Sequence, residues 1–189
     1  DVANAIYDGT DAVMLSAESA IGSFPEESVT IMNRIIESVE NDENNFNLQG
    51  RHKDESINIK TISTVDAITS AAYTIAKNAE AKAIVTFSVS GETTMRMSRE
   101  RAPVLILGLS PNIKTARKLQ IIWGVYSIHA KQDAQNATEM VSIACTVIKN
   151  KQLVVPGNSI VITAGVPFGN AGSTNLLRIA EIIDDKDLI

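Results

Sequence analysis

Short hydroxyl side chains and one glycine are concentrated in the segment TFSVSGETT, residues 86–94. The residues concerned are Ser88, Ser90, Gly91, Thr93 and Thr94. They follow an apolar run at 83–87 and precede a segment that we expect to be helical. A strand that turns into a helix exposes the free N–H groups of the first helical turn, and such groups bind anions. The segment therefore predicts a site for a phosphate group.

The same residues also fit a turn that binds no ligand. Ser90 is a suitable N-cap residue, because a serine oxygen accepts hydrogen bonds from first-turn N–H groups. Glu92 would repel a phosphate unless its side chain points away, whereas a carboxylate in the first turn is favourable when no ligand is present. Both interpretations, an anion site and a simple helix cap, stay open from these residues alone.

Other side chains that bind or react are few and scattered. His52 lies in a polar segment and His129 ends an expected strand, and neither has a Cys, His or carboxylate at ligand spacing, so no metal site is expected. The single cysteine, Cys145, lies in an apolar helical pattern and fits a reducing cytoplasm. No apolar stretch is long enough for a membrane span.

Charge argues against nucleic acid as a partner, because the net charge is −5 and no run of Lys and Arg is dense. The basic side chains near the turn are expected to form mostly a solvated helix face, part of which adds positive potential at the turn. These residues are Arg96, Arg99, Arg101, Lys114, Arg117 and Lys118.

The turn belongs to a region of alternating helices and strands. Strands rich in Val, Ile and Leu are expected at 83–87, 104–109, 125–129 and 159–165, with helices between them. This alternation predicts a three-layer α/β/α domain with a mostly parallel five-stranded sheet. The connection before the last strand, 175–183, is too short for a helical crossover, so that strand should be antiparallel.

Residues 1–40 have a different organisation. We expect the end of a helix, a short strand at 11–15 and a second helix whose apolar stripe should be buried. The stripe consists of Val29, Met32, Ile36 and Val39. A lone strand needs partners, so the rest of its sheet should lie upstream of Asp1, and the chain is interpreted as a fragment of a longer protein. Residues 41–60 are polar and Asn-rich and are expected to link this part to a domain at 61–189.

Three motifs resemble the pyruvate kinase family. They are DVANA followed by DGTDAVMLSAES at 1–19, SVSGETT at 88–94, and GVPFGNAGSTNLLRI at 165–179. The first motif is long and specific, and the order and spacing of the other two add weight. The resemblance implies that residues 1–40 are the last βα unit of a (β/α)8 catalytic barrel, a TIM barrel, and that 61–189 form the family's C-terminal domain.

The resemblance implies a phosphotransferase as the complete protein. Pyruvate kinases transfer a phosphoryl group from phosphoenolpyruvate to ADP, giving pyruvate and ATP in glycolysis, with Mg²⁺ and K⁺ as cofactors. Their essential lysine and metal-binding carboxylates lie upstream of Asp1, so these 189 residues should have no kinase activity alone. The family's C-terminal domain binds allosteric effectors and builds a homotetramer in the cytoplasm, and this role is expected of residues 61–189.

Site residues follow from the same resemblance. Ser16 and Glu18 would lie at the barrel mouth near the substrate pocket, or would only cap a loop by bonding to the backbone. Ala17 and Ile21 replace the family's usual glycine and lysine, so nucleotide contacts do not carry over to this loop.

The turn at 88–94 would hold an effector's phosphate through Ser88, Ser90, Gly91, Thr93 and Thr94. The loop at 165–173 would cover the site as a mobile flap, or is an ordinary Gly-rich connection. The flap residues are Pro167, Gly169, Gly172 and Ser173. Residues 131–144 lack the Trp and Arg that hold the second phosphate of fructose 1,6-bisphosphate in eukaryotic members. AMP or a sugar monophosphate is therefore the expected effector.

Two alternatives to an effector-binding domain stay open. One is a non-enzymatic α/β domain that binds a small ligand or a partner protein. The other is a domain that serves tetramer assembly only and retains a vestigial effector pocket.

Overall fold

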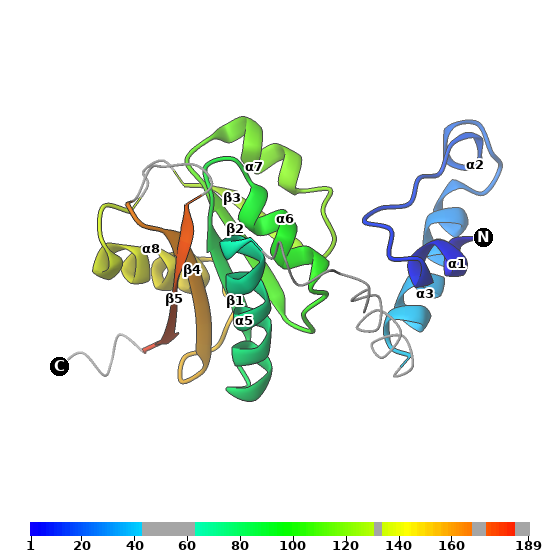
Figure 1. The fold of residues 1–189 in the computed structure, drawn as a ribbon. Coiled ribbons are helices and arrows are strands. Elements are labelled where there is room, and N and C mark those ends of the chain that lie inside the picture. The colour runs from blue at the N-terminus through cyan, green and yellow to red at the C-terminus, as the bar shows by residue number, and fades with distance from the viewer. Residues whose placement is uncertain (43–62, 131–133, 168–172, 184–189) are drawn as a thin grey trace. The chain divides into compact units, whose positions relative to one another are not determined.

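The computed structural model describes residues 1–42, 63–130, 134–167 and 173–183. The chain divides into two compact units, Asp1–Asn58 and Ile59–Ile189 (Figure 1). The linker predicted at 41–60 falls almost entirely outside the described residues.

The second unit is built on a five-stranded sheet with strand order β3-β2-β1-β4-β5. The strands are β1 (Ala83–Phe87), β2 (Leu105–Ser110), β3 (Val125–His129), β4 (Ser159–Gly165) and β5 (Thr174–Glu181). β1 pairs in parallel with β2 and β4, β2 pairs in parallel with β3, and β5 is antiparallel to β4. The mostly parallel sheet with an antiparallel last strand is thus confirmed.

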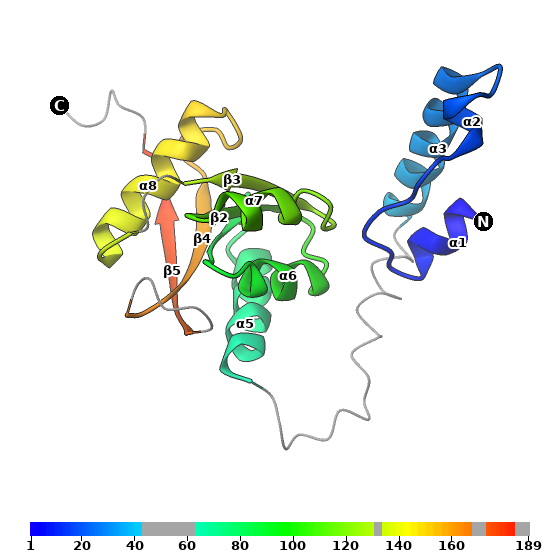
Figure 2. The ribbon, with the colours of Figure 1, turned by 90° about the horizontal axis from the view of Figure 1, so that it is seen from above.

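Helices cover both faces of this sheet (Figure 2). α5 (Thr64–Asn78), α6 (Glu92–Arg99) and α7 (Ile113–Leu119) lie on one face, and α8 (Ala137–Asn150) lies on the other. Neighbouring residues of β1 face opposite layers, since Val85 packs in a cluster with α8 side chains and Ile84 packs with those of α5 and α6. All five residues of β1 are buried, as is typical of a central parallel strand. The predicted three-layer architecture is confirmed.

The N-terminal ends of α5 and α6 lie at the same edge of the sheet, where β1 and β2 end. α6 follows β1 directly, and α5 precedes β1 along the chain and packs against both α6 and the sheet. Ser63 is the N-cap of α5, because its Oγ accepts a hydrogen bond from the N–H of Asp66 at 3.2 Å. The two helix N-termini therefore bring the start of α5 close to the hydroxyl-rich turn.

The first unit contains α1 (Val2–Tyr7), α2 (Ala17–Ala20) and α3 (Pro25–Glu40). Its described buried apolar side chains are Ile6 and Val39, and the Tyr7 hydroxyl donates to Asp42 Oδ2 at 2.9 Å. Residues 11–15, predicted as a strand, are not paired as a strand among the described residues. The physical reason is that a strand is defined by hydrogen bonds to a neighbouring strand.

The apolar stripe of α3 is buried only at its C-terminal end. Val39 is 6% exposed, whereas Val29 is 55% exposed, so burial of the complete stripe is not seen in this unit. Large apolar side chains elsewhere in the unit, Met14, Ile21 and Phe24, are also exposed. Among the helices that the structure describes, none has the length and apolar character needed to cross a membrane.

Candidate functional site

The turn between β1 and α6 is shaped by Ser88 and Gly91. Ser88 is buried, and its Oγ accepts a hydrogen bond from the N–H of Gly91 at 2.9 Å. Gly91 has a φ of 86°, in the left-handed region that glycine adopts without a steric penalty. A Cβ at this position would lie 3.0 Å from Thr115 Cγ2 and 3.3 Å from Leu119 Cδ2. Gly91 is therefore required both by the backbone conformation and by close packing against α7.

Ser90 is the exposed hydroxyl of the turn. The N-cap position of α6 is taken by Gly91, one residue after the predicted cap, and Ser90 Oγ accepts only a long hydrogen bond of 3.4 Å from the N–H of Glu92. The hydroxyl borders a hollow of about 390 Å³, whose lining residues are Ser90, Glu92, Met95, Arg96 and Arg99. Small-molecule sites have volumes of about 300–1,000 Å³, so the hollow is large enough for a small phosphate ester.

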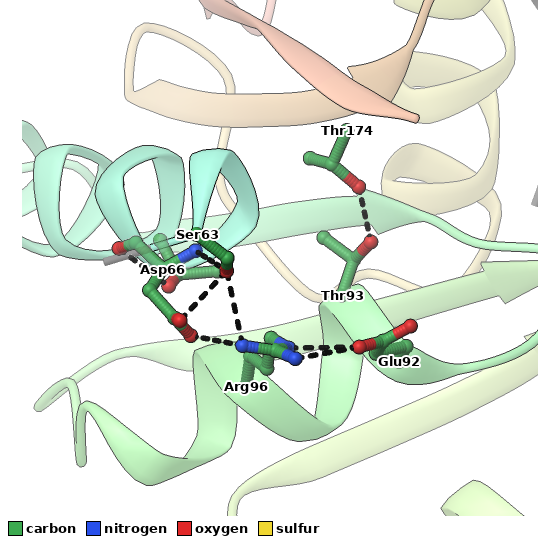
Figure 3. A network of polar contacts seen from close by, with 7 residues as sticks. Ser63, Asp66, Glu92, Thr93, Arg96 and Thr174 are labelled. Atoms are coloured by element: carbon green, nitrogen blue, oxygen red, sulfur yellow. Dashed lines mark hydrogen bonds and ion pairs between the residues drawn. The ribbon is translucent and has the colours of Figure 1, made fainter. Parts of the chain in front are cut away.

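Thr93 and Thr94 direct their hydroxyls into the protein. Thr94 Oγ1 lies 2.8 Å from Thr86 Oγ1 of β1, and both side chains are buried. Thr93 Oγ1 lies 2.5 Å from Thr174 Oγ1, at the start of β5 (Figure 3). The two threonines therefore join α6 to the sheet at two places, and phosphate contacts through their hydroxyls stay a prediction.

Arg96 lies between two carboxylates that come from different helices (Figure 3). Its Nη2 and Nε donate to Glu92 Oε1 at 2.7 and 3.1 Å, an i, i+4 pair within α6. Its Nη1 contacts Asp66 Oδ1 of α5 and donates to Ser63 Oγ at 3.2 Å. The Glu92 side chain thus points toward Arg96. The sequence placed Arg96 only within a basic helix face, because no local spacing indicates a partner 30 residues away.

Hydrogen bonds in this cluster stabilise the charged forms of Asp66 and Arg96. The bond from Ser63, followed by that from Arg96, lowers the pKa of Asp66 below its ordinary value. Asp66 and then Glu92 raise the pKa of Arg96. With two carboxylates around one guanidinium, the cluster has a formal charge of −1.

The described ends of the predicted flap lie close together. The Asn175 side chain bonds to both polar backbone groups of Val166, with Nδ2 donating to O at 2.7 Å and Oδ1 accepting from N–H at 2.9 Å. Gly165 lies against Ser173, because a Cβ on Gly165 would come within 2.3 Å of Ser173 Oγ. Pro167, which follows Val166, is exposed. Two other predicted flap residues, Gly169 and Gly172, lie outside the described residues.

The second predicted site, in the first unit, forms a backbone-capping arrangement. The N–H of Ser16 donates to Glu18 Oε2 at 3.0 Å. Hydrogen bonds from the N–H groups of Glu18 and Ser16 lower the pKa of Glu18. Both residues are exposed, and substrate contact through them stays a prediction. Within the part of the chain that the structure describes, no three His, Cys, Asp or Glu side chains are grouped so that they could hold a metal ion.

Comparison with known proteins gives two separate family matches. The family described as "Pyruvate kinase, alpha/beta domain" matches residues 66–180, and "Pyruvate kinase, barrel domain" matches residues 1–29. The chain belongs to the pyruvate kinase family. A pyruvate kinase of Agrobacterium vitis is 42% identical over 187 residues, covering 96% of this chain and 37% of the relative. A pyruvate kinase of Geobacillus stearothermophilus is 39% identical over 184 residues, covering 97% of this chain and 30% of the relative.

A solved pyruvate kinase structure from Cryptosporidium parvum has a similar fold. It matches with a TM-score of 0.79 and 28% sequence identity, over 96% of this chain and 35% of that one. The chain therefore spans about a third of the length of the pyruvate kinases that it matches.

Proposed function

We propose that this chain is the C-terminal part of a pyruvate kinase and that its α/β domain binds a phosphorylated effector. The observation that carries the effector role is the exposed Ser90 hydroxyl at the N-terminus of α6, on the edge of the 390 Å³ hollow. The complete protein would be a cytoplasmic homotetramer that transfers phosphoryl from phosphoenolpyruvate to ADP. Its Mg²⁺ and K⁺ would bind in the barrel, on residues outside this chain, and the chain alone would be inactive.

A phosphate at the turn would be held by groups from one short segment. The first N–H groups of α6 have no intrahelical acceptors, and the helix dipole favours an anion beside them. Ser90 Oγ can donate one further hydrogen bond, and Arg96 and Arg99 on the wall of the hollow supply positive charge. The turn offers these groups to a single phosphate, which supports AMP or a sugar monophosphate over fructose 1,6-bisphosphate.

The contact between Thr93 and Thr174 suggests how occupancy would be transmitted. Thr93 belongs to the first turn of α6, and Thr174 begins β5 directly after the 165–173 loop. A ligand that repositions the start of α6 would therefore act on the base of this loop and on β5. In the complete tetramer, such a shift would change subunit packing and the affinity of the barrel for phosphoenolpyruvate.

A second candidate function is tetramer assembly without an effector. It is favoured by the hydroxyls of Thr93 and Thr94, which already have partners inside the protein, and by the carboxylate of Glu92 on the hollow. Ligand titration distinguishes the two candidates.

The test is calorimetric titration of the 189-residue chain with AMP, ribose 5-phosphate, glucose 6-phosphate and fructose 1,6-bisphosphate. Ser90→Ala should weaken saturable binding about tenfold or more, because a hydrogen bond to a charged group is worth about 1.5–3 kcal/mol. Ser142→Ala removes another exposed serine, on α8, and should bind like the wild type. Absence of binding across the panel would favour the assembly role.

A further inference from the structure

We propose that Glu92 is a built-in competitor for the ligand at Arg96, so that a phosphate monoester binds by taking the place of the Glu92 carboxylate on that guanidinium. This inference rests on the proposed function, since it concerns the same hollow. It adds to that function how the ligand binds, by displacing Glu92, and it assigns to Glu92 an effect on the ligand affinity.

The guanidinium of Arg96 is almost fully used by its own chain. An arginine side chain has five N–H donors. Four contacts are made in the structure, two to Glu92, one to Asp66 and one to Ser63. A phosphate can therefore form the paired hydrogen bonds that arginine favours only if one of the carboxylates leaves.

Glu92 is the carboxylate that can leave. Asp66 is held a second time, because Ser63 Oγ donates to its Oδ2 at 2.7 Å within the cap of α5. Among the described residues, the Glu92 carboxylate contacts Arg96 alone, through one oxygen, and its side chain is 44% exposed. Release of Glu92 thus breaks one ion pair and leaves the contact between α5 and α6 in place.

The position of Glu92 makes it a substitute for the ligand. It is the first residue of α6, where a carboxylate interacts favourably with the same helix dipole that would attract a phosphate. It also lines the same hollow as Ser90 and Arg96. In the absence of ligand, Glu92 therefore supplies the negative charge that both the helix end and Arg96 favour.

Charge balance gives the reason for exchange rather than joint binding. With Glu92 in place, a phosphate dianion would add to a cluster that already has a formal charge of −1. When Glu92 turns into solvent, Asp66 and Arg96 remain as a neutral pair, and the dianion meets no uncompensated carboxylate there. A dianionic ester gains more from this exchange than a singly charged ligand does, because the attraction grows with the charge.

The experiment compares three variants of the 189-residue chain by calorimetric titration with AMP and ribose 5-phosphate at low salt. Glu92→Gln removes the competing charge and should tighten binding about three- to tenfold, with a smaller gain at high salt. Glu80→Gln makes the same charge change beyond the far end of α5 and should bind like the wild type. Arg96→Gln should weaken binding about tenfold or more, since it removes the cation.

A second measurement follows the Nε–H resonance of Arg96 by NMR, assigned by its loss in Arg96→Gln. Addition of AMP to the wild type should shift this resonance, because the phosphate takes the place of the Glu92 carboxylate at Nε. Glu92→Gln should shift it without ligand, because the oxygen that accepts from Nε then has no negative charge. If Ser90→Ala abolishes binding while Glu92→Gln binds no more tightly than Glu80→Gln, the competitor role is overturned and the effector site stands. If neither the wild type nor Glu92→Gln binds either probe, both proposals fail.

Discussion

The hydroxyl side chains around α6 fall into two groups, those that are buried and bond to one another and the one that is exposed. Thr86 and Thr94 bond to one another inside the layer between the sheet and α6, and Thr93 bonds to Thr174 at the base of the 165–173 loop. Ser90 has the same functional group, a hydroxyl, but it is exposed and lines the hollow. Loss of a buried hydroxyl is therefore expected to change stability, whereas loss of the Ser90 hydroxyl should change ligand binding.

Thr86 and Thr163 provide a matched test of buried hydroxyls. They lie side by side in β1 and β4 and are both fully buried, but Thr163 Oγ1 has no hydrogen-bond partner among the described residues. Thr86→Val strands the hydroxyl of Thr94 and should lower the free energy of unfolding by about 1–3 kcal/mol. Thr163→Val removes an unsatisfied hydroxyl and should leave the free energy of unfolding unchanged or raise it. Urea unfolding measures both, and equal losses would contradict the expectation.

Asp66 should contribute to stability in a pH-dependent way. Its pKa is lowered in the folded chain, first by Ser63 and then by Arg96. A group with a lowered folded pKa contributes stability above its unfolded pKa of about 4, and this contribution is lost as the pH falls through the folded pKa. The free energy of unfolding of the wild type should exceed that of Asp66→Asn by a constant amount at about pH 5–7, and the difference should shrink below about pH 4.

The difference in unfolding free energy between the wild type and Asp66→Asn should be small, about 1 kcal/mol or less. The reason is that the Asp66 side chain is 43% exposed, so solvent screens its charge. Denaturant midpoints measured across this pH range check it. A difference that does not change with pH would contradict the role of Asp66.

Gly91 is the residue at which β1, α6 and α7 come together. Gly91 ends the connection from β1, caps α6 and lies against Thr115 and Leu119 of α7. Three elements therefore depend on a residue without a side chain. Its packing role is independent of any ligand, and it can be tested separately from binding.

Gly91→Ala should destabilise the second unit through two effects. A left-handed φ costs a non-glycine residue about 1–2 kcal/mol, and the new methyl group would press on Thr115 and Leu119. Gly157→Ala is the matched control, because Gly157 has a φ of 83° but nothing within 4 Å of the added Cβ. We expect the loss for Gly91→Ala to exceed that for Gly157→Ala by about 1 kcal/mol or more in thermal or urea unfolding. Similar losses of unfolding free energy in the two variants would contradict this expectation and would show that α7 shifts to accommodate the methyl group.

The two units differ in how much apolar surface they bury by themselves. The second unit has two hydrophobic clusters, one on each face of its sheet. The first unit has Ile6 and Val39 as its described buried apolar side chains, while Met14 and Ile21 are 85% and 87% exposed. The stability of the 189-residue chain is therefore expected to come from the second unit.

Separate expression of the two units tests this expectation. A fragment of residues 59–189 should keep a cooperative unfolding transition, with a free energy of unfolding within about 1 kcal/mol of that of the whole chain. A peptide of residues 1–42 should show little helix by circular dichroism, because a helix of 16 residues without a packed core is marginal in water. A strongly helical peptide, or an unfolded 59–189 fragment, would contradict the assignment.

The sequence alone determined the layers of the α/β domain and the direction of its last strand. The apolar runs placed β1 and β4 at their observed residues, since buried parallel strands appear as short apolar runs. The edge strand β3 is also observed at its predicted residues. A short connection was enough to predict the antiparallel strand. Element ends were placed less accurately, because the strand predicted at 104–109 is observed as β2 at Leu105–Ser110 and strand ends depend on a few hydrogen bonds.

Only the tertiary structure decided which of the candidate groups meet. The contact between Arg96 and Asp66 joins residues 30 apart, and that between Thr93 and Thr174 joins residues 81 apart. It also placed the cap of α6 at Gly91 and left Ser90 exposed on the hollow. Residue type and spacing specify what a side chain can bond to, but packing of helices on a sheet specifies which partner is within reach. That is why the hydroxyl turn could be predicted from the sequence, whereas the contact of Arg96 with Ser63 and Asp66 of α5 depends on the fold.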